Sequence, residues 1–141
     1  MSNYDNEALE RIFDRTDGRC HICHRKMHFG NYGQPGHRGA WEVEHSIPRA
    51  HGGTDNLNNL YGAHVACNRA KGTFSSRTAR AWNGRQRAPL SADRKEKARW
   101  GNAATLGTLG GVVALMVAPE VAILGAGLAA LLGYTLDPNN A

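Results

Sequence analysis

The sequence predicts a mixed α+β domain stapled by zinc and followed by an apolar helical hairpin. Two observations lead to this fold class. Cys20 and Cys23 share an i, i+3 spacing with His64 and Cys67, and two such pairs can complete a tetrahedral Zn²⁺ site. Charge is also divided unevenly, because all 17 Lys and Arg residues lie in the front part while residues 101–141 hold two acids and no base. A zinc-bound front and a nearly uncharged back indicate two functional units.

The 141-residue chain has room for one ordinary domain, or for a small domain with an appendage. We expect residues 1–76 to form the zinc-stapled domain and residues 77–100 to form a basic linker that is helical in places. Residues 101–141 should form the Gly-rich apolar hairpin. The net charge of +5 suits a polyanion such as nucleic acid or an anionic lipid surface, although it could serve solubility alone.

Within the first segment, the apolar pattern of residues 5–15 predicts an amphipathic helix of about three turns. Residues 27–40 are rich in Gly, Asn and His and predict a loop. Residues 41–47 alternate apolar and polar side chains, which is typical of a short strand. Residues 64–71 should form a short helix that ends at Gly72.

The proposed zinc ligands are Cys20, Cys23, His64 and Cys67. A small domain with few large apolar side chains needs such a staple. An odd number of cysteines argues against a disulfide framework, and the rival interpretation is free thiols with Cys67 buried as an apolar residue. Three histidines near the first pair could replace His64 as the fourth ligand: His21, His24 and His28.

A second set of polar residues fits phosphodiester hydrolysis. If the backbone bends, the Glu44 carboxylate can hold a divalent metal while the neighbouring His45 imidazole addresses a water molecule. Asn68 would add a neutral oxygen ligand to the same metal. Asn59 could orient the imidazole, and Asn56 competes with it for this role because both precede a leucine.

The order of these residues is similar to that of the HNH endonuclease family, which has the ββα-metal fold. The resemblance covers about residues 17–73 and rests on four segments: Glu44-His45-Ser-Ile-Pro48, Gly52-Gly53, Asn59-Leu60 and Cys67-Asn68-Arg-Ala-Lys71-Gly72. It implies that His45 is the general base and that Asn59 supports the base or its loop. It also implies that Glu44 and Asn68 bind a catalytic Mg²⁺ or another divalent metal. Two departures stand out: His64 replaces the usual third zinc cysteine, and Glu44 replaces the more usual Asp.

The resemblance implies a metal-dependent DNA endonuclease with little sequence specificity that leaves 3′-hydroxyl and 5′-phosphate ends. Four basic residues would contact the DNA backbone: Arg69, Lys71, Arg77 and Arg80. A double-strand cut needs two molecules or two events, so a homodimer is one option. Two alternatives remain, a zinc-dependent nucleic-acid binding module without catalysis and a membrane-active toxin. A compact nuclease of this kind suits a phage, mobile-element, defence or toxin role.

The apolar arms at residues 103–118 and 121–136 would each extend about 24 Å as helices, short of the roughly 30 Å of hydrocarbon in a bilayer. Their composition nevertheless favours association of residues 103–136 with a membrane. The alternative is a hairpin that packs on itself, on a partner copy or on the domain. Because the N-terminus resembles no secretory signal, we expect a cytoplasmic protein, in the membrane-associated case at the inner face of the cell membrane.

Overall fold

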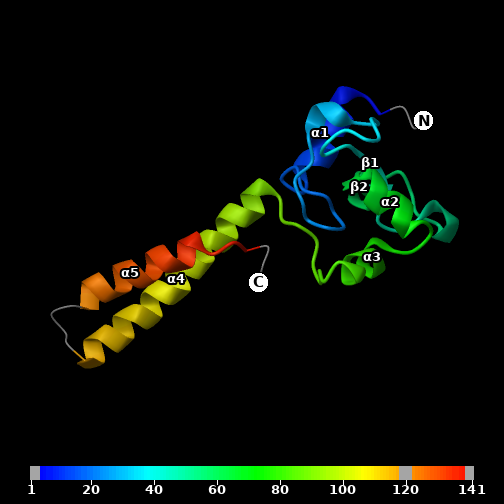
Figure 1. Ribbon diagram of the computed structural model, residues 1–141. Helices are drawn as coiled ribbons and strands as arrows, with labels where there is room; N and C mark the ends of the chain where they lie inside the picture. Colours follow the sequence, from blue (N-terminus) through cyan, green and yellow to red (C-terminus); the bar gives the residue numbers. More distant parts are fainter. Residues whose placement is uncertain (1–3, 118–121, 139–141) are drawn as a thin grey trace. The chain divides into compact units, whose positions relative to one another are not determined.

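The computed structural model describes residues 4–117 and 122–138, and the chain divides into two compact units, Met1–Ala92 and Asp93–Ala141 (Figure 1). The first unit contains α1 (Asn6–Asp14), β1 (Trp41–His45), β2 (Leu60–His64), α2 (Val65–Lys71) and α3 (Ser76–Trp82). It also contains three short 3₁₀ turns, η1 (Phe29–Asn31), η2 (Arg49–His51) and η3 (Leu57–Asn59). The second unit holds α4 (Ala92–Val117), which begins at the unit boundary, and α5 (Ala122–Thr135).

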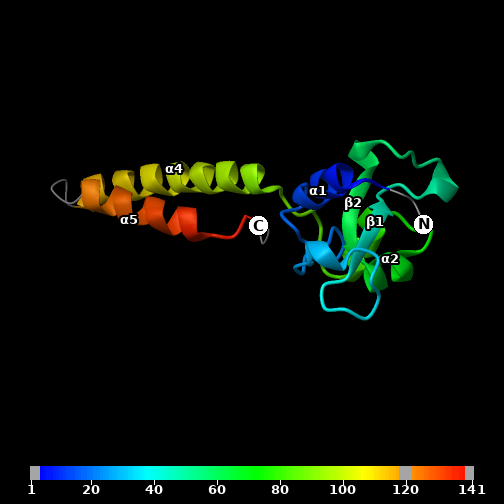
Figure 2. The ribbon, with the colours of Figure 1, turned by 90° about the horizontal axis from the view of Figure 1, so that it is seen from above.

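A ββα arrangement forms the centre of the first unit. β1 and β2 pair antiparallel, with Trp41 opposite His64 and His45 opposite Leu60. α2 follows β2 without a linker and contacts both strands (Figures 1 and 2). The first unit therefore has the mixed helix and strand composition that the sequence predicts.

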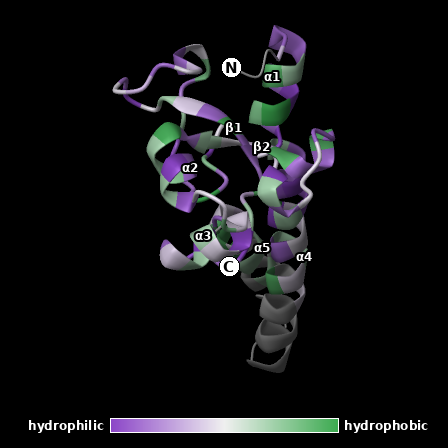
Figure 3. Cartoon of the chain, turned by 90° about the vertical axis from the view of Figure 1, so that its right-hand side faces the viewer, coloured by the Kyte–Doolittle hydropathy of each residue, from purple (hydrophilic) through white to green (hydrophobic). Residues whose placement is uncertain are grey.

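The expected helix over residues 5–15 is confirmed as α1. Asp5 caps it, because its carboxylate accepts the backbone N–H of Ala8 at 2.8 Å. Leu9 and Ile12 lie on one face and are buried, and apolar and polar residues share the helix in Figure 3. This apolar face packs α1 against β2.

Trp41 anchors the small apolar core. Its side chain is fully buried and its indole N–H donates to the carbonyl of Phe29 at 3.0 Å. The ring of Phe13 lies 5.1 Å from the Trp41 ring, and Ile12 and Leu60 complete the buried centre. These contacts join α1, the 27–40 loop and both strands.

β1 is shorter than the strand predicted over residues 41–47. Its last residue is His45, and the next two backbone N–H groups still bind Asn59, first its carbonyl and then its side chain. Ser46 donates to the Asn59 carbonyl at 2.9 Å, and Ile47 donates to the Asn59 side chain at 2.8 Å. The predicted helix over residues 64–71 is confirmed as α2, with His64 just before its first residue. β2 was not predicted from the residue pattern, whereas α3 falls in the basic segment that the sequence predicts to be helical in places.

In the second unit, α4 and α5 lie side by side (Figures 1 and 2). The rings of Trp100 and Tyr134 are 5.2 Å apart, and Gly133 sits so close to the backbone of Asn102 that a side chain there would collide with it. The apolar hairpin expected over residues 101–141 includes the connection at 118–121, which lies outside the described residues, and it stays a prediction. Across residues 4–117 and 122–138, no helix combines the length and apolar character needed to cross a membrane.

Candidate metal centre and reaction site

The four predicted zinc ligands meet in one place. One ligand atom from each of Cys20, Cys23, His64 and Cys67 lies within 4.8 Å of all the others. The first two come from the turn after α1, and the other two come from the junction of β2 and α2. Three sulfurs and one ring nitrogen are donors that Zn²⁺ prefers in structural sites. These residues could therefore hold a structural zinc.

A tight backbone turn aims both sulfurs of the first pair at the same point. The Cys20 N–H donates to the carbonyl of Arg25, and the His24 N–H donates to the carbonyl of Cys20, both at 2.9 Å. His24 has a φ of 65°, the left-handed conformation that closes the turn. The bridge between Arg19 and Lys26 closes its base. This segment, residues 19–26, is called the zinc knuckle below.

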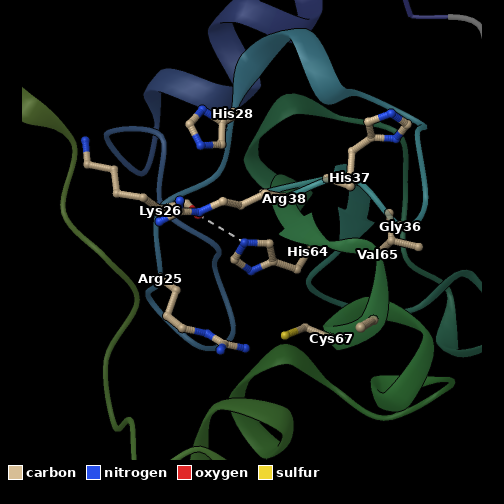
Figure 4. A pocket seen from close by; sticks show the side chains of 12 residues that line it. Arg25, Lys26, His28, Gly36, His37, Arg38, His64, Val65 and Cys67 are labelled. Carbon is tan, nitrogen blue, oxygen red and sulfur yellow. Dashed lines mark hydrogen bonds between the residues drawn. The ribbon is translucent and has the colours of Figure 1, made fainter.

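The hydrogen bonds of His64 identify its ligand atom. Nε2 lies 3.1 Å from the backbone carbonyl of Lys26, and a carbonyl can only accept, so Nε2 carries the hydrogen (Figure 4). Nδ1 is therefore free to bind a metal, and it faces the Cys23 sulfur at 3.4 Å. A backbone contact that fixes the second ring nitrogen is typical of metal-bound histidine. Of the alternative ligands, His21 is engaged elsewhere, and neither His24 nor His28 belongs to the group of four.

The electrostatics of this group favour a cation. Hydrogen bonding with Cys20 and Cys23 raises the pKa of His64 to about 10. Hydrogen bonding with the other two sulfurs lowers the pKa of Cys23, whereas it raises the pKa of Cys20. Without a metal, the negative thiolate charge of this group has to be balanced by a proton that the ligand atoms share. Zn²⁺ would replace that proton and satisfy all four donors.

Glu44 lies in a buried polar network on the inner face of β1. Its side chain is 0% exposed, and Ser76 Oγ lies 2.7 and 2.9 Å from its two oxygens. His21 Nδ1 also contacts it, and Lys71 Nζ lies 3.6 Å away. Arg80 lies 2.7 Å from the other nitrogen of His21, so that nitrogen accepts and Nδ1 donates to Glu44. Burial lowers the pKa of His21, in keeping with a neutral ring between the two charges.

This placement does not fit Glu44 as a ligand of a catalytic metal. Both of its oxygens are engaged by interior groups, and none of its surface is open to substrate. Asn68, the second expected ligand, instead donates from Nδ2 to Glu42 Oε1 at 2.9 Å. Both Glu42 and Asn68 are half-buried at the surface of the ββα unit. The structure therefore pairs Asn68 with Glu42 and not with Glu44.

His45 ends β1 and is held by two residues that sequence reasoning missed. Its Nε2 lies 2.7 Å from Asp55 Oδ1, and Arg49 Nη2 lies 2.6 Å from the same oxygen. The hydrogen bonds from His45 and then Arg49 lower the pKa of Asp55. The ionised carboxylate can only accept, so Nε2 carries the hydrogen. Nε2 therefore cannot accept a hydrogen bond from Arg49 Nε, which lies 3.2 Å away as a neighbouring cation. In the neutral ring, Nδ1 of His45 then holds the lone pair.

Asn59 clamps the loop that carries these groups. Its side chain accepts the N–H of Ile47 and donates to the carbonyls of Ile47 and Thr54, at 2.8, 3.1 and 2.9 Å. These bonds go to loop backbone and not to the imidazole. Asn56, its competitor in the sequence, is exposed. Asn59 is thus placed to support the loop of the expected base.

Two of the four basic residues expected on DNA lie in the interior. Lys71 is 2% exposed and donates to the carbonyls of His45 and Phe74, at 3.0 and 3.1 Å. Arg80 is buried against His21. In this structure both cations balance the buried Glu44 charge instead of facing a polyanion. Arg69 and Arg77, the other two, are exposed.

Comparison with known proteins agrees with this geometry. Residues 20–74 match the HNH endonuclease family. The resemblance predicted from the residues is confirmed over this segment, which is less than half of the chain. It spans all four cysteine and histidine ligands, both strands and α2. No curated protein and no solved structure matched the chain.

Removing the fourth predicted zinc ligand should unfold the first unit. We expect the purified chain to hold one zinc per molecule, measured by atomic emission, and His64→Ala to weaken zinc binding by about 100-fold or more with loss of cooperative unfolding. The control is His28→Ala, which removes a nearby histidine outside the group. Equal zinc loss in both variants would contradict the assignment of His64.

The two adjacent glycines in the loop after β1 should respond differently to alanine. Gly52 has a φ of 79° with open space around it, so Gly52→Ala should lower the free energy of unfolding by about 1 kcal/mol. A side chain on Gly53 would meet the backbone carbonyl of Ile47, and the loop could give way only by breaking its bonds to Asn59. We expect Gly53→Ala to lower the free energy of unfolding by about 3 kcal/mol in urea titrations of the zinc-loaded protein. Equal losses for the two variants would be inconsistent with the close approach at Gly53.

Proposed function

We propose that this chain is a nuclease that hydrolyses phosphodiester bonds of DNA with little sequence specificity, and that His45 is its general base. The HNH match supports a nucleic-acid substrate. The observation that carries the proposal is the arrangement of His45, whose Nε2 is held by Asp55 while Nδ1 keeps its lone pair. An oriented neutral imidazole at the end of a strand is the group that activates water in such reactions.

The proposed reaction needs one proton transfer at His45. Nδ1 takes a proton from a water molecule as the water oxygen bonds to phosphorus. The bond from phosphorus to the 3′ oxygen then breaks, and the departing alkoxide takes a proton from solvent, which leaves 5′-phosphate and 3′-hydroxyl ends. The Asp55 carboxylate stabilises the imidazolium that forms, as an orienting acid does beside other catalytic histidines. A positioned base of this kind contributes about 10²- to 10⁴-fold to the rate.

A catalytic Mg²⁺ or another divalent metal between Glu44 and Asn68 stays a prediction of the family resemblance. The buried position of Glu44 does not support it. The carboxylate beside Asn68 is Glu42. If a divalent metal is required, Glu42 and Asn68 are the neighbouring oxygen-bearing groups to test.

A second candidate is a zinc-dependent nucleic-acid binding module without catalysis. One observation favours it, namely that Glu44 and Asn68 have separate partners instead of a common site. Membrane association through residues 103–136, a homodimer and residence at the inner face of the cell membrane stay predictions from the sequence, as does the toxin alternative.

Plasmid nicking distinguishes the nuclease from the binding module. In buffer with Mg²⁺ or Mn²⁺, we expect the zinc-loaded protein to relax supercoiled plasmid and His45→Ala to slow this about 10²- to 10⁴-fold. The matched control is His51→Ala, an exposed histidine in the same loop, which should cut at the rate of the unmodified protein. Intact plasmid with every protein and both metals would overturn the nuclease assignment.

Substitutions of the two glutamates of β1 should separate an effect on stability from an effect on cleavage. Glu44→Gln leaves Lys71 without its buried counter-charge, and we expect a loss of about 3 kcal/mol in the free energy of unfolding. Glu42→Gln should change that free energy by less than about 1 kcal/mol while raising the divalent metal concentration at half-maximal cleavage. Unchanged stability of Glu44→Gln together with a raised metal requirement would instead restore Glu44 as the metal ligand.

A further inference from the structure

We propose that a basic pocket beside the zinc centre binds the phosphodiester backbone of DNA, an inference that extends the proposed nuclease function to its substrate contacts. The pocket has a volume of about 550 Å³. It is lined by the end of the zinc knuckle, the loop at residues 36–40 and the start of α2 (Figure 4). Six of its lining residues have basic side chains: Arg25, Lys26, His28, His37, Arg38 and the predicted zinc ligand His64. No Asp or Glu lines the pocket, and the Cys67 sulfur that also lines it belongs to the metal group.

The charge available to a ligand comes from Lys26 and Arg38. Both side chains are exposed, and Lys26 Nζ lies 3.5 Å from the backbone carbonyl of Asp17, a neutral acceptor. Arg25 is differently occupied, because a hydrogen bond from its guanidinium to the Cys23 thiolate raises the pKa of Arg25. Arg25 therefore offsets part of the negative charge of the sulfurs, and Lys26 and Arg38 are left to face an anion.

The pocket is held open by backbone contacts, so it does not depend on mobile side chains for its shape. The His28 N–H donates to the Gly39 carbonyl at 3.0 Å, which ties the 36–40 loop to the residues that follow the zinc knuckle. The Val65 N–H donates to the Ala40 carbonyl at 3.3 Å, which ties the same loop to α2. Gly39 packs so closely on His28 that a side chain there would collide with it. A preformed concave site with cations at its rim is suited to phosphate groups.

The burial of Lys71 and Arg80 strengthens the case that this pocket supplies the charge that contacts DNA. Those two cations belong to the interior, so the charge that meets a polyanion must come from other residues. Lys26 and Arg38 both lie in the segment that matches the HNH family, and the His64 ring nitrogen donates to the Lys26 carbonyl. Contacts of this type bind phosphates of any sequence, in keeping with low sequence specificity.

The salt dependence of DNA binding tests the pocket. We would measure the Kd of the full-length, zinc-loaded protein for a fluorescent DNA duplex between 50 and 300 mM KCl, in buffer without added divalent metal. For the double variant Lys26→Gln/Arg38→Gln, we expect the slope of log Kd against log salt to fall by about 2, or about one per lost cation. The Kd at the middle of this range should weaken by about tenfold or more. Zinc content equal to that of the unmodified protein verifies that the variant is folded.

The matched control is Arg94→Gln/Lys97→Gln, which removes two exposed cations from α4. Its slope should stay within about half a unit of the unmodified value. An unchanged slope for the pocket variant, or equal losses in both variants, would overturn the pocket proposal. Plasmid cleavage separates this result from the proposed function. If the unmodified protein cuts DNA and the Lys26→Gln/Arg38→Gln variant binds DNA normally, the pocket proposal alone is refuted. If binding depends on the pocket but no protein cuts DNA, the nuclease proposal alone is refuted.

Discussion

The metal group of Cys20, Cys23, His64 and Cys67, called the zinc clamp here, is the constraint on which the first unit depends once it holds a structural zinc. Its four ligands come from two segments more than 40 residues apart, and together they fix the zinc knuckle against the junction of β2 and α2. The apolar core is small and is centred on Trp41, Ile12 and Leu60, so burial alone offers limited stabilisation. A structural zinc can contribute an apparent 10–16 kcal/mol, roughly the whole stability of an ordinary domain. The strand pair and the basic pocket both rest on segments that this clamp holds in place.

The alternation of side chains along β1 divides the family motif into two functions. Glu44 and His45 are neighbours in sequence, but successive strand residues leave opposite faces. Glu44 therefore enters the interior, where Ser76 and His21 occupy its oxygens, while His45 ends the strand beside Asp55. A bend that brought both side chains to one face would have to unseat the buried carboxylate. Adjacent motif positions thus serve architecture on one side of the strand and the proposed chemistry on the other.

Local spacing made the zinc site predictable, because ligands three residues apart converge whatever the rest of the fold does. The helices α1 and α2 were predictable for the same reason, since the apolar pattern of α1 and Gly72 at the end of α2 are local signals. Asp55 could not be found in this way. It lies ten residues from His45 in a turn, and only the loop clamped by Asn59 brings the two side chains together. The pairing of Asn68 with Glu42 likewise follows from the packing of α2 on β1, which the sequence pattern does not specify.

The interior positions of Lys71 and Arg80 carry a wider consequence for basic proteins. A run of Lys and Arg in a sequence suggests a surface that binds nucleic acid. A buried carboxylate also needs compensating cations, and here Lys and Arg residues of the same run provide them. Lys71 lies 3.6 Å from Glu44, and Arg80 reaches that charge through the neutral ring of His21. A count of basic residues therefore overstates the charge that faces solvent. Because the interior cations come from α2 and α3, the exposed cations Lys26 and Arg38 supply a larger share of the charge that can contact a polyanion.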